Sequence, residues 1–134
     1  MTAAQEKYLR AIYDLTLQED TTRLSQIAGH VGVSKASASV AIRWLERNGY
    51  TRRQDKRLIL LTPEGNQAVV LSYGKREILC RFLAEQLGVP KETATADAEQ
   101  LEPLVSTQTL CAICRHIRRG ACMLACGKCD QGGL

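Results

Sequence analysis

Residues 24–50 constrain the fold more than any other part of the chain. They read LSQIAGHVGVSKASASVAIRWLERNGY, two short amphipathic helical segments joined by a tight turn at Gly32. Ser34 is placed to cap the second segment, since its hydroxyl can accept a hydrogen bond from an N–H of the first turn, and Asn48-Gly49 is placed to end it. This pattern is typical of a helix-turn-helix unit, whose second helix enters a DNA groove. The alternative is an αα-hairpin that does not bind DNA.

The second helical segment has one apolar and one small, polar face. Its periodicity predicts that Val33, Val40, Trp44 and Leu45 lie against the core. The polar face begins with a lysine, an alanine and two serines, which would let a DNA backbone approach closely. A major groove is wide enough to admit such a helix. The alternative is an ordinary surface helix.

A β-hairpin is predicted directly after this helix. Residues 50–53 and 58–61 form short strand-like arms around a polar link at residues 54–57. A hairpin in this place is the wing of a winged helix, and its basic side chains would lie against phosphates. Lys35 is the best candidate for a base contact. The predicted DNA-binding residues are Ser34, Lys35, Ser37, Ser39, Arg43, Arg52, Arg53, Lys56 and Arg57.

Basic residues are concentrated in the same region. The chain has a formal net charge of +4, and residues 34–57 hold seven basic and two acidic side chains. Such a concentration favours a polyanionic partner, although a solvated basic surface would have the same composition.

Helical patterns account for most of the remaining chain. Helices are predicted over residues 3–18, 93–104 and 107–118, and a long one is predicted to begin after Thr62 as its N-cap and to run to Leu87. In that long helix the apolar pattern places Val70, Leu79 and Leu87 inside, and Cys80 is assigned to the core.

These segments together resemble a known family. The segments YLRAIYDL, residues 24–50, LILLTPEG, REILCRFLAEQLGV and DAEQLEPLVS are similar, over roughly residues 5–118, to the diphtheria-toxin-repressor and manganese-transport-regulator family. The resemblance implies a mainly α protein of the short, two-domain form, with a winged helix-turn-helix domain at residues 1–62 and an all-α dimerisation domain at residues 63–119. Residues 120–134 would be a Cys/Gly-rich tail. The family consists of metal-dependent repressors that act as homodimers on partly palindromic operators in double-stranded DNA.

The metal site that the resemblance implies is altered here. Positions that supply ligands in the family hold Lys7, Arg10 and Arg76, and the final histidine of its acidic motif is replaced by a proline. Protonated lysine and arginine have no lone pair to offer an ion. Glu99 and Glu102 are kept, so we expect interdomain manganese or iron to be lost and these five charged residues to form ion pairs in its place. The alternative is that all five are simply solvated, in which case they contribute little.

Five cysteines near the C-terminus follow a metal-ligand pattern. Two CxxC pairs with short spacings suit tetrahedral zinc or an iron–sulfur cluster, and nearby arginines favour the thiolate. A thiol redox switch, small buried core residues and cysteines without a function remain as alternatives. The candidate metal ligands are Cys111, Cys114, Cys122, Cys126 and Cys129.

Other functional classes have less support. The first residues lack a secretory signal and no apolar run is long enough to span a membrane, so a cytoplasmic protein is expected. The sequence shows no phosphate-binding glycine loop, no paired carboxylates and no nucleophile with a base, so nothing in it indicates an enzyme. No small-molecule substrate is evident. The main alternative is a winged-helix protein-interaction or assembly module that carries a zinc or iron–sulfur site.

Overall fold

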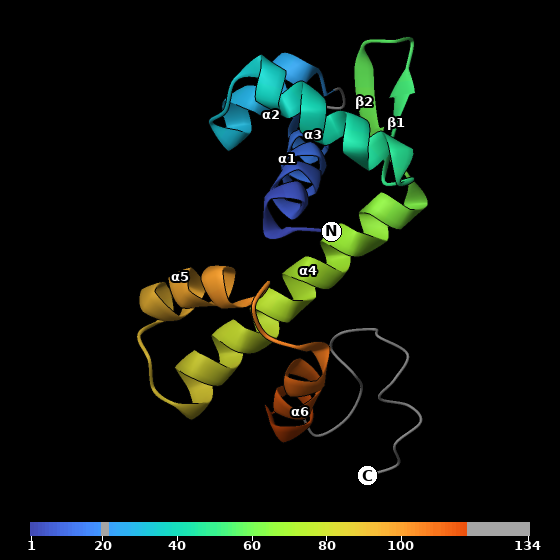
Figure 1. The fold of residues 1–134 in the computed structure, drawn as a ribbon. Coiled ribbons are helices and arrows are strands. Elements are labelled where there is room, and N and C mark those ends of the chain that lie inside the picture. Colours follow the sequence, from blue (N-terminus) through green and yellow to red (C-terminus); the bar gives the residue numbers. More distant parts are fainter. Residues whose placement is uncertain (20–21, 118–134) are drawn as a thin grey trace. The chain divides into compact units, whose positions relative to one another are not determined.

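The computed structural model describes residues 1–19 and 22–117. The chain divides into two compact units, Met1–Val69 and the part from Val70 onward, and the boundary falls within a long helix (Figure 1). The predicted mainly helical class is confirmed.

Three helices and a hairpin build the first unit. They follow the order α1 (Ala3–Glu19), α2 (Leu24–Val31), α3 (Lys35–Arg47), β1 (Thr51–Gln54) and β2 (Leu58–Leu61). The strands pair antiparallel, with Thr51 opposite Leu61 and Gln54 opposite Leu58, and they stand beside the C-terminal end of α3 (Figure 1). This is the predicted winged-helix arrangement.

Three helices and one strand of the first unit contribute buried apolar side chains to its core. These side chains include Leu9, Ile12 and Leu15 from α1, Ile27 and Ala28 from α2, Ala38, Ile42 and Leu45 from α3, and Ile59 from β2. The wing is tied to this core through Thr22, whose carbonyl accepts a hydrogen bond of 2.8 Å from the Ile59 amide. The Thr22 hydroxyl lies 3.2 Å from the hydroxyl of Thr16. The wing therefore has a fixed place beside α3 within this unit.

Local sequence signals set the ends of α3. The Ser34 hydroxyl accepts a 3.1 Å hydrogen bond from the Ser37 amide, which confirms the predicted N-cap. Gly32 and Gly49 have φ of 82° and 80°, the left-handed conformation that glycine adopts without strain. The predicted helix-turn-helix therefore begins and ends where these residues place it.

The predicted core face of α3 is confirmed for Leu45 and wrong for Val33 and Val40, and Trp44 is half-buried. Val40 is 67% exposed and Val33 is 37% exposed, whereas Ala38, Ile42 and Leu45 are fully buried. The three buried residues follow one another at i, i+4 and i+7, so they lie on one side of the helix. The prediction failed because it gave a valine priority over an alanine as a core residue.

The second unit holds the rest of the long helix and two shorter ones. It contains most of α4 (Pro63–Arg81), the π-helical turn η1 (Phe82–Gln86), α5 (Lys91–Leu101) and α6 (Thr107–Ile117). Its core is formed by Ile78, Leu79, Ala98, Leu110, Cys111 and Cys114.

Several predictions for this region need correction. The long helix leaves α-helical geometry at Phe82 instead of continuing to Leu87, and α5 is shorter than predicted at its C-terminal end. Val70 is 52% exposed and Leu87 is 60% exposed, so neither lies in the core. Cys80, which was predicted to lie in the core, is half-buried and packs against the edge of the cluster around Leu79.

Candidate nucleic-acid interface

The outer face of α3 carries a stripe of four exposed residues. Ala36, Val40, Arg43 and Arg47 are exposed and follow one another at i, i+4, i+7 and i+11. This spacing places them along one side of the helix, opposite the buried stripe that includes Ile42. The N-terminal half of the stripe is apolar and the C-terminal half is cationic.

Polar residues at the start of α3 flank this stripe. Ser34, Lys35 and Ser37 are exposed, and the Ser34 hydroxyl donates a 3.0 Å hydrogen bond to the Ser37 hydroxyl. One turn further along, Arg43 Nη2 donates to the Ser39 hydroxyl at 3.4 Å. The predicted α3 residues are thus brought together at the surface, with Ser39 half-buried.

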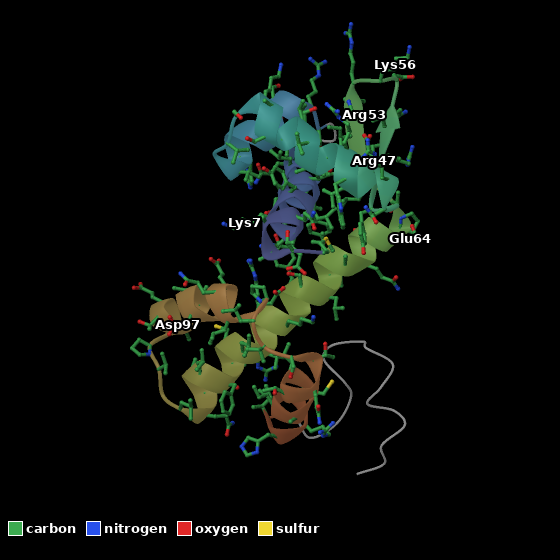
Figure 2. The ribbon with its side chains drawn as sticks, in the orientation of Figure 1. Lys7, Arg47, Arg53, Lys56, Glu64 and Asp97 are labelled. Carbon is green, nitrogen blue, oxygen red and sulfur yellow. The ribbon has the colours of Figure 1, made fainter. Side chains whose placement is uncertain are left out.

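The four basic residues of the wing have three different surroundings. Arg53 Nε donates a hydrogen bond to Glu46 Oε1 of α3 at 2.6 Å, so this arginine links the wing to the helix by an ion pair. Arg52 points to the opposite face of the strand, because neighbouring strand residues alternate in direction. Lys56 and Arg57 lie in the exposed turn at the hairpin tip, and Figure 2 shows Lys56 there.

The turn at the hairpin tip has an uncommon backbone. Asp55 and Lys56 have φ of 53° and 62°, and the Arg57 amide donates to the Gln54 carbonyl at 3.3 Å. Both φ values lie in the left-handed region, which costs an L-residue free energy. Neither central residue is glycine.

Sequence reasoning missed two residues of this surface. Val40 was assigned to the core, and Arg47, at the C-terminal end of α3 (Figure 2), was counted only as part of the basic region. The period that places Ile42 inside would have placed both outside, so the signal was present in the sequence.

The altered metal-site residues of the second unit are engaged with one another or with neighbours. Arg76 Nη1 lies 3.9 Å from Glu99 Oε1, and the Arg76 guanidinium lies 5.8 Å from the centre of the Tyr73 ring. Glu102 is only 3% exposed, and its carboxylate accepts a hydrogen bond from the Ser72 hydroxyl. These side chains do not fit a divalent ion, because a cationic guanidinium is paired with Glu99, one of the two carboxylates kept from the family pattern.

The other two altered positions lie on α1 in the first unit. Arg10 Nη1 is 3.5 Å from Glu6 Oε2 one turn away, and Lys7 is exposed (Figure 2). Among the residues that the structure describes, no three His, Cys, Asp or Glu side chains are grouped in a way that would hold a metal ion.

Two of the five candidate cysteine ligands lie within the described part of the chain. Cys111 and Cys114 are 7% and 0% exposed and pack with Ile78, Leu79 and Leu110 in the core of the second unit. This environment favours the alternative in which they act as small apolar core residues. Cys122, Cys126 and Cys129 lie outside the described residues.

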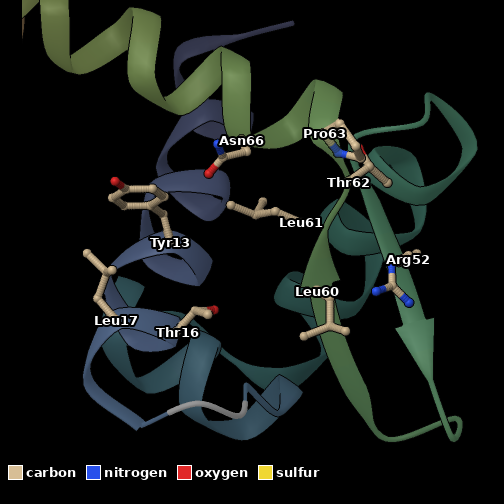
Figure 3. A pocket seen from close by; sticks show the side chains of 9 residues that line it. All are labelled: Tyr13, Thr16, Leu17, Arg52, Leu60, Leu61, Thr62, Pro63 and Asn66. Carbon is tan, nitrogen blue, oxygen red and sulfur yellow. The ribbon is translucent and has the colours of Figure 1, made fainter.

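A pocket of about 520 Å³ lies on the first unit between α1, the wing and the start of α4 (Figure 3). Tyr13, Leu17 and Leu60 contribute to its walls, and Arg52 is the charged side chain among its lining residues. Separately, none of the helices in residues 1–19 and 22–117 has the length and apolar character needed to cross a membrane.

The fold and the exposed helix with its adjoining wing define a winged-helix protein, and comparison with known proteins gives its family. Residues 1–58 match the model described as iron-dependent repressor, N-terminal DNA binding domain, and residues 62–120 match its metal binding and dimerisation domain. The chain belongs to the family of iron- and manganese-dependent transcriptional repressors.

Relatives and a solved structure agree with this assignment. The transcriptional regulator MntR of Salmonella typhimurium is 33% identical over 78% of this chain and 66% of its own length. The iron-dependent repressor IdeR of Mycobacterium tuberculosis is 31% identical over 75% of this chain and 44% of its own. The crystal structure of the metal-dependent transcriptional regulator MtsR superposes with a TM-score of 0.76 at 27% identity, covering 87% of this chain and 54% of that one. The chain thus spans two thirds or less of the length of these relatives.

Proposed function

We propose that this chain is a homodimeric, winged-helix transcriptional regulator that binds partly palindromic DNA without requiring a metal ion. In this proposal residues 1–62 bind DNA, with α3 in the major groove, and residues 63–119 dimerise. The observation that carries the DNA-binding part is the outer stripe of α3, which is exposed for its whole length beside an exposed basic wing tip. Membership of a repressor family supports the same function.

The basic side chains would contact different parts of the DNA, depending on their position. Lys56 and Arg57 at the wing tip would contact phosphates, and Arg43 and Arg47 on α3 would contact the DNA next to them. Lys35 and the serines at the start of α3 would reach base edges or the backbone. Arg53 would act indirectly, because its ion pair with Glu46 holds the wing against α3. Phosphate contacts of this kind position a protein on DNA, whereas base contacts specify the sequence.

Salt dependence of DNA binding tests this proposal. A DNA site is first selected from random duplexes with the intact chain, and its affinity is then measured over a range of salt concentrations. Each phosphate contact should add about −0.9 to the slope of log affinity against log salt concentration. Replacing Lys56 with glutamine should therefore weaken binding and make the slope shallower by about one.

A matched control is available in the second unit. Lys91 is exposed at the start of α5, in the unit that the proposal assigns to dimerisation. Lys91→Gln therefore removes a surface charge that is not part of the proposed DNA-binding surface, and it should leave both affinity and slope unchanged. The proposal is wrong if no duplex is selected, or if Lys56→Gln and Lys91→Gln behave alike.

Independence from metal is proposed because the retained acidic residues already have partners. Glu99 is paired with Arg76, and Glu102 is buried with Ser72 as its hydrogen-bond donor. Seating a divalent ion there would bring it next to the guanidinium of Arg76, and charges of the same sign at short range repel one another. In this proposal the ion pairs form part of a permanently assembled second unit.

Metal removal tests this second part. DNA affinity should change less than about twofold, below 0.5 kcal/mol, between buffer with excess chelator and buffer with manganese or ferrous iron. Manganese titration followed by calorimetry should give no tight site. A tight site that is lost in Glu99→Ala would contradict the proposal.

A metal site at the C-terminal cysteines is a separate proposal. A zinc ion or iron–sulfur cluster would need ligands from Cys122, Cys126 and Cys129, and the burial of Cys111 and Cys114 beside Leu110 leaves them less available. Metal analysis and a visible spectrum of anaerobically purified protein, intact and truncated after Arg119, would test it. Zinc, or iron with sulfide, that is present in the intact chain and lost on truncation would support a site in the tail.

A further inference from the structure

The apolar part of the outer stripe of α3 is unusual for a surface proposed to contact DNA. Val40 stands at its centre and is 67% exposed, with Ala36 one turn before it and Arg43 one turn after. Val40 lies almost opposite Ile42 and Leu45, which are buried, so it projects away from the core of its unit. A valine in this position is exposed although burying it would be favourable.

The chemistry of a valine limits what it can recognise. Its side chain has no hydrogen-bond donor or acceptor, so it cannot pair with the polar edge of a base. Placed against such an edge, it would leave the base groups without partners, which is costly. The 5-methyl group of thymine is the apolar feature that an ordinary base pair presents in the major groove. Val40 and that methyl group therefore match in chemistry.

We propose that Val40 is a specificity-determining residue that contacts the 5-methyl group of one thymine in each half-site. This inference rests on the proposed function, since it needs α3 in the major groove. Val40 would favour thymine over cytosine at that position, because cytosine offers an amino group and no methyl. Arg43, one turn after Val40, and Lys35 at the start of α3 would contribute affinity, while Val40 would select the base.

Uracil substitution in the DNA tests the inference directly. In the site selected with the intact chain, each thymine is replaced in turn by uracil, which keeps the base pair and removes only the methyl group. One thymine per half-site should be sensitive, with a loss of about three- to fivefold in affinity, as expected for one methyl-sized group withdrawn from water. Substitution in both half-sites should cost tenfold or more.

The coupling to Val40 is the decisive part. Val40→Ala should bind the thymine and uracil forms of the site equally well, whereas Val33→Ala, which shortens an exposed valine outside α3, should keep the full uracil effect. The unfolding of both variants is monitored by the fluorescence of Trp44. Unfolding midpoints equal to that of the original chain would establish that the variants are folded. The inference is overturned if no thymine is sensitive, or if Val40→Ala keeps the uracil effect. Failure of the intact chain to bind any duplex would overturn the proposed function itself, which is a separate result.

Discussion

Replacing Ile42 with alanine should lower the free energy of unfolding of the first unit by about 2–5 kcal/mol. Ile42 is fully buried in α3, which packs against α1, α2 and β1. Removal of its outer methyl groups leaves a cavity that its neighbours can fill only in part, and the lost contacts add to the lost burial. The measurement is urea unfolding followed by Trp44, the only tryptophan of the chain, which lies in the same helix.

The matched control is Val40→Ala, two residues earlier in the same helix. Val40 is 67% exposed, so its shortening should change the free energy of unfolding by no more than about 0.5 kcal/mol. The two substitutions shorten β-branched side chains on opposite sides of α3 and should differ by severalfold in their cost. Equal losses in the two variants would mean that Val40 is in the core and would also remove the basis for its proposed contact with thymine.

Replacing Gly65 with alanine is expected to be the second severe substitution. Gly65 lies in the first turn of α4, and a Cβ atom there would overlap the carbonyl oxygen of Tyr50. That carbonyl accepts a 3.1 Å hydrogen bond from the Thr62 amide, and the Thr62 hydroxyl donates to the Gly49 carbonyl at 2.5 Å. The obstacle is backbone fixed on both sides, so α4 must shift, at a cost of about 1–3 kcal/mol or more.

Gly29→Ala provides the control for the Gly65 substitution. Gly29 lies within α2, and nothing lies within 4 Å of a Cβ built there. Alanine should therefore stabilise the first unit by about 0.5–1 kcal/mol, because glycine costs that much in a helix interior. The two Gly→Ala variants should thus move the urea midpoint in opposite directions. A Gly65→Ala protein that is as stable as the original would contradict the close approach at Tyr50.

Short-range signals were read correctly from the sequence. The cap at Ser34, the left-handed glycines at Gly32 and Gly49 and the cap at Thr62, whose hydroxyl accepts from the Gly65 amide at 3.1 Å, all depend on residues at most four apart. The chemistry of such signals is contained in the local sequence, so the order of helices and the hairpin could be predicted from it.

Features set by packing were harder to predict. The side of α3 that faces the core is decided by small Ala38 fitting where the helices cross, and hydrophobicity alone ranks Val40 above it. The change to a π-helical turn at Phe82 breaks no rule of residue type in the sequence. For the site, residue types indicated the exposed basic positions, but the partner of Arg53 on α3 depends on the wing folding back beside the helix.

At the wing tip, the charge of Lys56 comes at the expense of the stability of the turn. Lys56 holds a left-handed backbone that costs an L-residue about 1–2 kcal/mol, and glycine would adopt it without that cost. Selection for folding alone would therefore favour glycine in place of Lys56. If the tip contacts DNA, as proposed, a lineage that regulates genes through it keeps the lysine and a less stable wing. Among descendants of this chain, loss of that lysine would then be an early sign of relaxed selection on DNA binding.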